Sequence, residues 1–257
     1  MNQTKRRQYL IRALLDEQPD YRDMDIPTDT VGQKRLLRSL MNVRLPGQIG
    51  AEFLSVQDAY LREATREKGI TALADLTPVE PGIFLWQGDI TTLACDSIVN
   101  AANSGMTGCY QPCHNCIDNC IHTFAGVQLR NACAEIMQRQ GYDEPTGQAK
   151  LTPAYNLPCR YVIHTVGPIV EGPLTAEHER LLAACYRACL TIAEEHGLRS
   201  IAFCCISTGV FGFPKRAAAE IAVQTVRDCR AQNHSDIEVI FNVFNESDYE
   251  IYRDLLG

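Results

Sequence analysis

The sequence lacks any long uninterrupted apolar run. No stretch approaches the roughly 18 consecutive apolar residues that a membrane span requires. The opening residues, MNQTKRRQYLIRALLDEQ, also lack the continuous apolar centre of a secretory signal peptide. We therefore expect no membrane partner, and a cytoplasmic address follows as the default.

The chain also lacks an excess of basic residues. It has 24 Lys and Arg against 31 Asp and Glu, a formal net charge of −7 at pH 7. A protein whose main partner is a nucleic-acid backbone needs a cationic face, so this balance argues against nucleic acid as the partner. A small phosphate-bearing ligand stays compatible with it, because backbone N–H groups at the start of a helix can hold phosphates without basic side chains.

Internal repeats and low-complexity tracts are absent too, and the chain divides near Pro81 instead. Its 257 residues suffice for one large domain or for a domain with a sizeable extension. Before Pro81, apolar residues recur at helical spacing and predict three helices, at about 5–17, 30–43 and 51–68. Pro78 and Pro81-Gly82 mark the boundary. We predict a helical N-terminal extension over residues 1–80.

After Pro81, short apolar or β-branched runs alternate with helical stretches. Such alternation is typical of an α/β sandwich, in which helices cover both faces of a mixed sheet. We predict this domain over residues 81–257. The expected strands are 83–87, 97–100, 149–152, 161–165, 200–206 and 238–243, and the expected helices are about 118–140, 176–196, 215–231 and 247–256.

Three loops that follow expected strands have the composition of ligand-binding loops. In open α/β sheets, ligands lie beyond the carboxyl ends of the strands. The glycines of residues 207–214 (STGVFGFP) allow close backbone approach and an anion-binding nest of N–H groups. Residues 100–105 (NAANSG) offer two amides, and residues 88–91 (GDIT) offer a carboxylate to an exocyclic amine. Taken alone, residues 88–91 and 207–214 fit an ordinary cap or turn better, and residues 100–105 are also compatible with one.

Twelve cysteines are many, but a disulfide framework is not expected in a chain that is neither short nor visibly secreted. Most of those in apolar runs are expected to behave as small buried hydrophobes. Residues 109–122 differ, because four cysteines and two histidines fall within fourteen residues. Thiolates with imidazole suit zinc. The cluster is local and no second pair of ligands follows downstream, which favours a metal with three protein ligands and an open fourth position. The alternatives to metal binding are reactive thiols or merely buried thiols.

Five segments together resemble the hallmark segments of the macrodomain family, in the family's order. The resemblance covers roughly residues 82–257. It implies a three-layer α/β/α sandwich with a mixed sheet, and it implies binding of ADP-ribose, whose bond to proteins some macrodomains hydrolyse. The segments are residues 88–91, 98–103, 145–149, 161–168 and 207–214.

One departure from the family pattern is informative. Macrodomains of the mono-ADP-ribosyl hydrolase type have a glycine run between their second asparagine and a Val-Asp-Gly turn. Here cysteines and a histidine replace that run, which resembles the zinc-containing subclass of bacteria and fungi. That subclass implies the zinc ligands Cys109, His114 and Cys116, with Cys113 and Cys120 as competitors for the metal. The helical extension fits the same subclass.

The resemblance also implies a role for each matching position. Asp89, followed by Ile90, bonds the adenine amine, and Phe244 stacks on the adenine ring. Asn103 falls on the asparagine of the distal ribose, and Asp118 falls on the catalytic aspartate. The diphosphate lies on the backbone of Ser207, Thr208, Gly209, Val210 and Phe211.

These assignments predict a zinc-dependent hydrolase that removes mono-ADP-ribose from acidic side chains of proteins. Zn²⁺ would polarise oxygens of the distal-ribose ester or lower the pKa of a bound water to about 7. Asp118 would orient that water or accept its proton, while Asn103 fixes the ribose. How the work divides between the zinc and Asp118 stays open.

The expected partners are ADP-ribose and an ADP-ribosylated protein. The resemblance implies a lipoyl-carrier protein that a sirtuin-type transferase has modified. Two other functions stay open: a non-catalytic ADP-ribose reader with a structural zinc, and an O-acetyl-ADP-ribose deacetylase.

Overall fold

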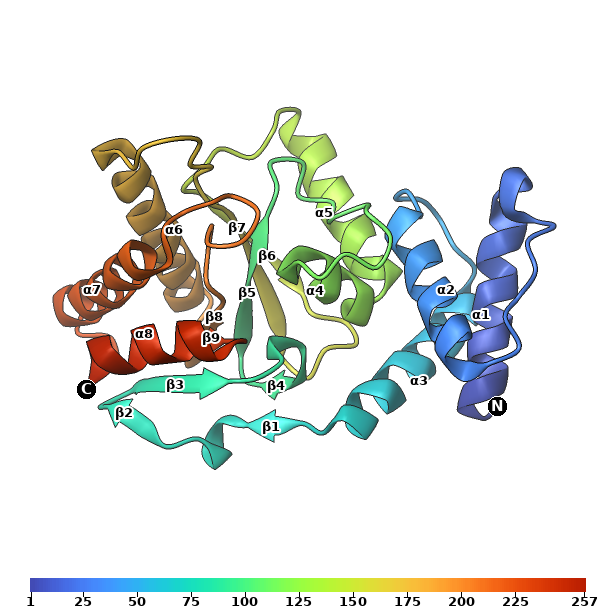
Figure 1. Cartoon of the computed structure of the whole chain (residues 1–257), viewed down its shortest axis with the longest axis horizontal. Helices are drawn as coiled ribbons and strands as arrows, with labels where there is room; N and C mark the ends of the chain where they lie inside the picture. Colours follow the sequence, from blue (N-terminus) through green and yellow to red (C-terminus); the bar gives the residue numbers. More distant parts are fainter.

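Three helices begin the chain, as the apolar spacing predicts. The computed structural model describes residues 1–257 and places α1 (Gln3–Glu17), α2 (Thr30–Val43) and α3 (Ala51–Lys68) side by side (Figure 1). The side chains of Asn2 and Asp29 cap α1 and α2 by accepting hydrogen bonds from backbone N–H groups of the first turn. The inward faces of these helices form a hydrophobic core of their own, separate from that of the sheet.

A mixed seven-stranded sheet forms the centre of the second unit, as predicted. Its order is β2-β3-β9-β8-β5-β7-β6, and only the outer strands β2 and β6 run antiparallel to their neighbours. Two short strands, β1 (Thr71–Ala72) and β4 (Leu93–Ala94), pair separately. The strands of the main sheet are β2 (Pro78–Glu80), β3 (Ile83–Gln87), β5 (Ser97–Ala102), β6 (Ala149–Pro153), β7 (Tyr161–Val166), β8 (Ser200–Phe203) and β9 (Glu238–Val243).

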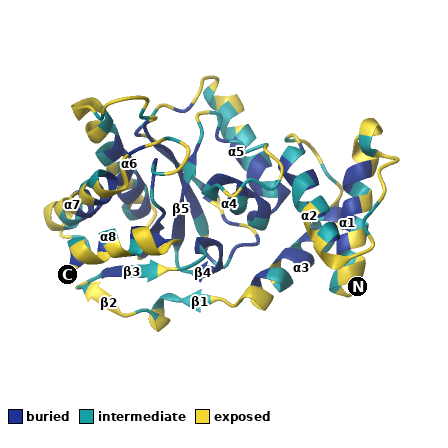
Figure 2. Ribbon diagram, viewed as in Figure 1, coloured by how far each residue is buried: buried dark blue, intermediate teal, exposed yellow.

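Helices cover both faces of this sheet and bury its apolar strands. Helices α4 and α5 lie on the side nearer the N-terminal helices, and α6, α7 and α8 lie on the other (Figure 1). Figure 2 shows the buried positions gathered in the central strands and on the inward faces of the helices. None of the helices combines the length and the apolar composition needed to cross a membrane. The helix bounds are α4 (Ile117–Ala125), α5 (Val127–Gln140), α6 (Ala176–Glu195), α7 (Lys215–Asn233) and α8 (Glu246–Leu256).

The structure differs from the sequence-based expectation at three places. The expected helix at 118–140 is two helices, because Gly126 has a φ of 95° in the left-handed region and breaks the hydrogen-bond ladder. The strand expected to reach residue 206 ends at Phe203, ahead of a turn in which Ser207 has a φ of 65°. Residues 71–80, expected within a helical extension, contain β1 and β2, and β2 joins the main sheet.

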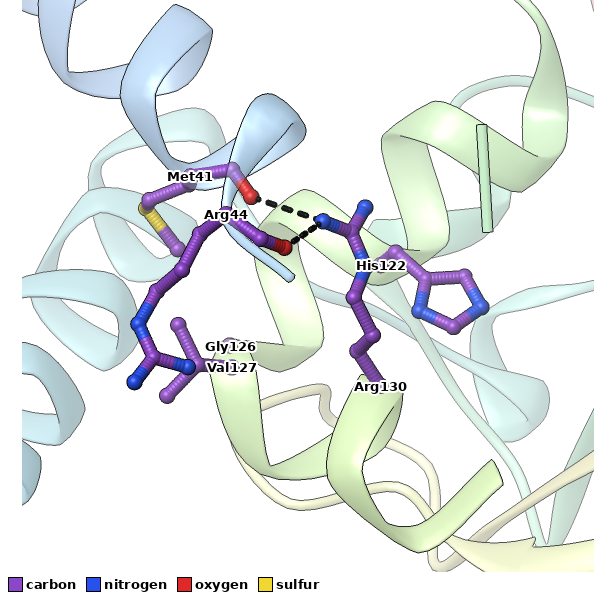
Figure 3. Close-up of a pocket in the computed structure, with 6 residues that line it drawn as sticks. All are labelled: Met41, Arg44, His122, Gly126, Val127 and Arg130. Atoms are coloured by element: carbon purple, nitrogen blue, oxygen red, sulfur yellow. Dashed lines mark hydrogen bonds between the residues drawn. The ribbon is translucent and has the colours of Figure 1, made fainter. Parts of the chain in front are cut away.

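Buried polar contacts join the N-terminal helices to α4 and α5. Gln57 on α3 is fully buried, and its Oε1 accepts a hydrogen bond from the backbone N–H of Val127 at 3.0 Å. Arg130 on α5 donates from Nη1 to the carbonyl oxygens of Met41, Asn42 and Arg44, at 3.2, 2.7 and 2.5 Å. Figure 3 shows the bonds to Met41 and Arg44. These carbonyls end α2, where a cation interacts favourably with the helix dipole. The two units are therefore locked together by hydrogen bonds as well as by apolar packing.

Replacing Arg130 with methionine should lower the free energy of unfolding by about 2–3 kcal/mol, because three buried carbonyl groups lose a charged donor. Arg139→Met is the matched control, since Arg139 lies on the exposed side of the same helix; its cost should stay within about 0.5 kcal/mol. Urea denaturation followed by circular dichroism measures both. Equal stability of the two variants would contradict the role given to Arg130.

Candidate active site

The loop over residues 108–116, called the metal loop below, brings three potential metal ligands together. The ligand atoms of Cys109, His114 and Cys116 lie within 4.8 Å of one another, and Cys109 Sγ is 3.5 Å from His114 Nδ1. Tetrahedral zinc with bonds of about 2.0–2.3 Å separates its ligand atoms by about 3.5–3.8 Å. Two sulfurs and one imidazole nitrogen fit Zn²⁺ in number and chemistry, and the distance from Cys109 to His114 matches this spacing.

The other two cysteines of the cluster turn toward α2. Cys113 Sγ lies 3.2 Å from the Ser39 hydroxyl, and the Cys113 thiol donates to the carbonyl of Arg35 at 3.4 Å. Cys120 Sγ accepts a hydrogen bond from Arg38 Nη2 at 3.5 Å, and burial raises the pKa of the Cys120 thiol. Neither sulfur joins the group of three.

A buried carboxylate stands directly after the metal loop. Asp118, in the first turn of α4, is only 5% exposed, and burial raises its pKa to about 6 despite two amide donors. Asn100 Nδ2 donates to Asp118 Oδ1 at 2.8 Å, and Asn103 Nδ2 donates to Oδ2 at 3.3 Å. Both asparagines come from the end of β5 or the residues that follow it. The structure therefore brings Asn103 and Asp118 into contact, and it adds Asn100 to the site.

His122 is a neighbour of Asp118 to which the sequence analysis gave no role. Its ring is buried, and Nε2 lies 3.5 Å from Asp118 Oδ1, one helical turn back along α4. Gly108 packs on this ring, since a Cβ added at Gly108 would lie 2.8 Å from it, and Gly108 has a φ of 87°. The spacing of four residues from Asp118 on a predicted helix was the available signal.

His164 belongs to the same network and is held in one neutral form. Asn100 Nδ2 donates its second hydrogen to His164 Nδ1 at 3.1 Å, so Nε2 carries the proton and donates to Thr152 Oγ1 at 2.9 Å. Burial lowers the pKa of His164 to about 3. His122, Cys133 and His164 also bring ligand atoms within 4.8 Å, but the protonated Nε2 leaves His164 no lone pair for a metal there.

The predicted adenine contacts lie at the ends of two adjacent strands. Strands β3 and β9 pair in parallel with Gln87 opposite Val243, so the residues that follow them start side by side. Asp89 caps a 3₁₀ turn with Oδ1, while its Oδ2 pairs with Lys68 Nζ at 3.0 Å. Phe244 is 77% exposed and Ile90 is buried. An exposed aromatic ring and a fixed carboxylate therefore follow neighbouring strands at this edge.

The predicted phosphate loop leaves β8 at the same edge of the sheet. Ser207 is buried in the left-handed region, and its carbonyl accepts from the backbone N–H of Phe213 at 3.0 Å, which closes the loop. Phe211 is braced from outside, because its carbonyl accepts from the N–H of Val170 at 2.8 Å. Thr208, Gly209 and Val210 form the outer turn before α7. Strands β3, β9, β8 and β5 are parallel neighbours, so all the predicted site residues follow strands that end at one edge.

Comparison with known proteins agrees with this geometry. The family described as Macro domain matches residues 99–222. A protein-ADP-ribose hydrolase of Treponema medium is 61% identical over 100% of both chains. One of Staphylococcus aureus (strain MSSA476) is 48% identical over 97% of this chain and 94% of the relative.

Solved structures with the same fold include macrodomains with bound nucleotides. The crystal structure of a Trypanosoma brucei macrodomain in complex with ADP-ribose matches with a TM-score of 0.66 and 31% identity, over 86% of this chain and 95% of that chain. An Oceanobacillus iheyensis macrodomain with ADP matches with a TM-score of 0.62 and 38% identity, over 70% and 93% of the two chains. By fold and by sequence identity along its whole length, the chain belongs to the macrodomain family, among its protein-ADP-ribose hydrolase enzymes.

Proposed function

We propose that this enzyme removes mono-ADP-ribose from acidic side chains of proteins by zinc-dependent hydrolysis of the ester at the distal ribose. The observation that carries the proposal is the position of the metal loop. It connects Asn103, assigned to the distal ribose, with Asp118, the buried carboxylate of the site. The loop between these two residues carries three ligands of the zinc type. They would therefore lie close to the scissile ester at the distal ribose.

Cys109, His114 and Cys116 would hold the metal. Two thiolates and one neutral imidazole balance the charge of Zn²⁺, so the centre does not repel the nearby diphosphate. When bound, Zn²⁺ supplies Lewis acidity to oxygens at the distal ribose. Three protein ligands leave a fourth position open, which is the pattern of catalytic rather than structural zinc sites.

Asp118 orients the attacking water and accepts its proton. The two asparagine amides fix one carboxylate oxygen each, so the group keeps a single orientation. The buried ring of His122 lies beside Oδ1, with its Nε2 at 3.5 Å on the next turn of α4. Asn103, beside the carboxylate, is the residue to which we assign the distal ribose.

The remaining contacts position the nucleotide. Asp89 accepts a hydrogen bond from the adenine amine, beside Ile90, and Phe244 stacks on the ring. The backbone of residues 207–211 receives the diphosphate. The substrate we propose is a lipoyl-carrier protein modified by a sirtuin-type transferase and acted on in the cytoplasm, which is supported by the resemblance to the zinc-containing subclass.

Metal removal should abolish turnover and spare ligand affinity. The purified protein should contain about one zinc per chain, and Cys116→Ser should contain none, whereas the control Cys229→Ser on α7 keeps it. Chelation should stop release of ADP-ribose from an aspartate-modified protein without weakening binding of free ADP-ribose. Full activity of metal-free Cys116→Ser would refute zinc dependence.

The same assay separates the competing functions. Binding of ADP-ribose by the zinc-loaded protein with no turnover would identify a reader with a structural zinc. Much faster turnover of O-acetyl-ADP-ribose than of the modified protein would identify a deacetylase.

Replacing Asp118 with asparagine should lower kcat by about 10²- to 10⁴-fold, because the amide keeps the shape of the side chain but cannot accept the proton. Zinc content and ADP-ribose affinity should stay close to those of the wild type. Asp236→Asn, at an exposed position outside the site, is the control. Wild-type kcat in Asp118→Asn would assign the proton transfer to another group.

Phe244→Ala should weaken ADP-ribose binding by about 5- to 150-fold, since stacking of a base on an aromatic ring contributes about 1–3 kcal/mol. The ring is 77% exposed, so its removal should leave folding intact. Tyr142→Ala, which removes another exposed aromatic ring, serves as the control. Isothermal titration with ADP-ribose measures both, and equal affinities would remove Phe244 from the binding site.

A further inference from the structure

We propose that helix α2 of the N-terminal unit positions the metal loop, and that Arg38 is the positioning residue. The inference rests on the proposed zinc centre, but it concerns residues outside the ligand set. It gives the helical extension a specific task in the metal site.

Arg38 contacts the metal loop directly at His114, and it acts on the rest of the loop through Asn119. Its Nη2 donates to the backbone carbonyl of His114 at 2.7 Å, to Asn119 Oδ1 at 2.9 Å and to Cys120 Sγ at 3.5 Å. Hydrogen bonds from a guanidinium are charge-assisted and therefore stronger than neutral ones. One side chain of α2 thus reaches the backbone of a ligand residue that is 76 positions away in the sequence.

Asn119 extends this support to the other two ligands. Its Nδ2 donates to the backbone carbonyls of Cys109 and Gln111, at 3.3 and 2.9 Å. Its backbone N–H points at Cys116 Sγ, 3.4 Å away. Asn119 is fully buried, and its Oδ1 accepts from Arg38, so this amide keeps its orientation through α2. Each of the three ligand residues is therefore one or two hydrogen bonds from Arg38.

A second contact from the same face of α2 fixes the middle of the loop. Asn42, four residues after Arg38, accepts a hydrogen bond from the backbone N–H of Cys113 at 2.9 Å. Its Nδ2 donates to Thr123 Oγ1 on α4 at 2.9 Å. Cys113 has a φ of 54°, a left-handed conformation that costs a non-glycine residue energy and persists when neighbouring contacts impose it.

Helix α2 is itself firmly attached to the rest of the enzyme. Arg130 binds the carbonyls at its end, and its guanidinium lies 4.3 Å from the ring centre of Tyr110 in the metal loop. Figure 3 shows Arg130 between the end of α2 and the His122 ring. The cavity that remains among these side chains is about 10 Å³, roughly the space of one water molecule. A helix held this way can transmit its fixed position to the loop.

Hydrogen bonds that hold the ligand residues of a metal affect its affinity, and their removal typically weakens metal binding by about 10- to 100-fold. Arg38→Ala should therefore weaken zinc binding by about that factor, measured by competition with a chromophoric chelator. Arg35→Ala is the matched control, because Arg35 lies on the same helix with an exposed side chain and contacts Cys113 only through its backbone carbonyl. Its zinc affinity should match that of the wild type within about twofold.

Arg38→Lys should recover part of the affinity, because an ammonium also carries charged donors, although it has three N–H groups instead of five and reaches less far. The melting temperature of each variant, with zinc and after chelation, separates positioning from a general role in folding. A positioning role predicts that Arg38→Ala loses more stability in the zinc-bound form than in the metal-free form. An equal loss in both forms, or unchanged zinc affinity, would overturn the inference. Activity that persists after zinc removal would instead contradict the proposed function and leave these affinities valid.

Discussion

The proposed metal site depends on a loop that has no regular secondary structure. This loop must hold two thiols and an imidazole within reach of one cation. Residues 108–116 contain neither helix nor strand, so the loop cannot fix its own shape. Neighbouring elements provide the restraint. Arg38 and Asn42 reach the loop from α2, and Asn119 reaches it from α4. Gly108 packs against the buried ring of His122, which lies beside Asp118.

This constraint connects the two units of the chain to one reaction centre. The parallel strands bring the residues proposed to contact adenine, phosphate and ribose to one edge of the sheet, because neighbouring strands end together there. The helical unit lies beside that edge and touches it at several points. Lys68 on α3 pairs with Asp89, α2 holds the metal loop, and Arg130 ties α2 back to α5. The proposed metal site, the proposed nucleotide site and the packing of the extension thus belong to one continuous structure.

The sequence predicted the elements and the residue types of the site better than it predicted their mutual support. Period and turn signals identified six strands of the main sheet and most helices but missed the short strands β1, β2 and β4, and the resemblance supplied the residues that follow each predicted strand. The break at Gly126 was missed because helical residues continue on both sides of a single glycine. Arg38 was given no role, and Asn100 was not linked to Asp118, because their partners lie in other elements, at distances in space that no local pattern encodes. Cys113 and Cys120 were left as competing ligands for the same reason, since only the folded α2 turns them away.

The most direct test of the account is zinc-edge X-ray absorption of the purified enzyme, which counts sulfur and lighter ligands around the metal. An open site held by Cys109, His114 and Cys116 predicts two sulfurs at about 2.3 Å and lighter atoms, from imidazole and solvent, at about 2.0–2.1 Å. Three or four sulfurs at the metal would mean that Cys113 or Cys120 closes the site. That result would contradict a catalytic zinc with a free position for the substrate.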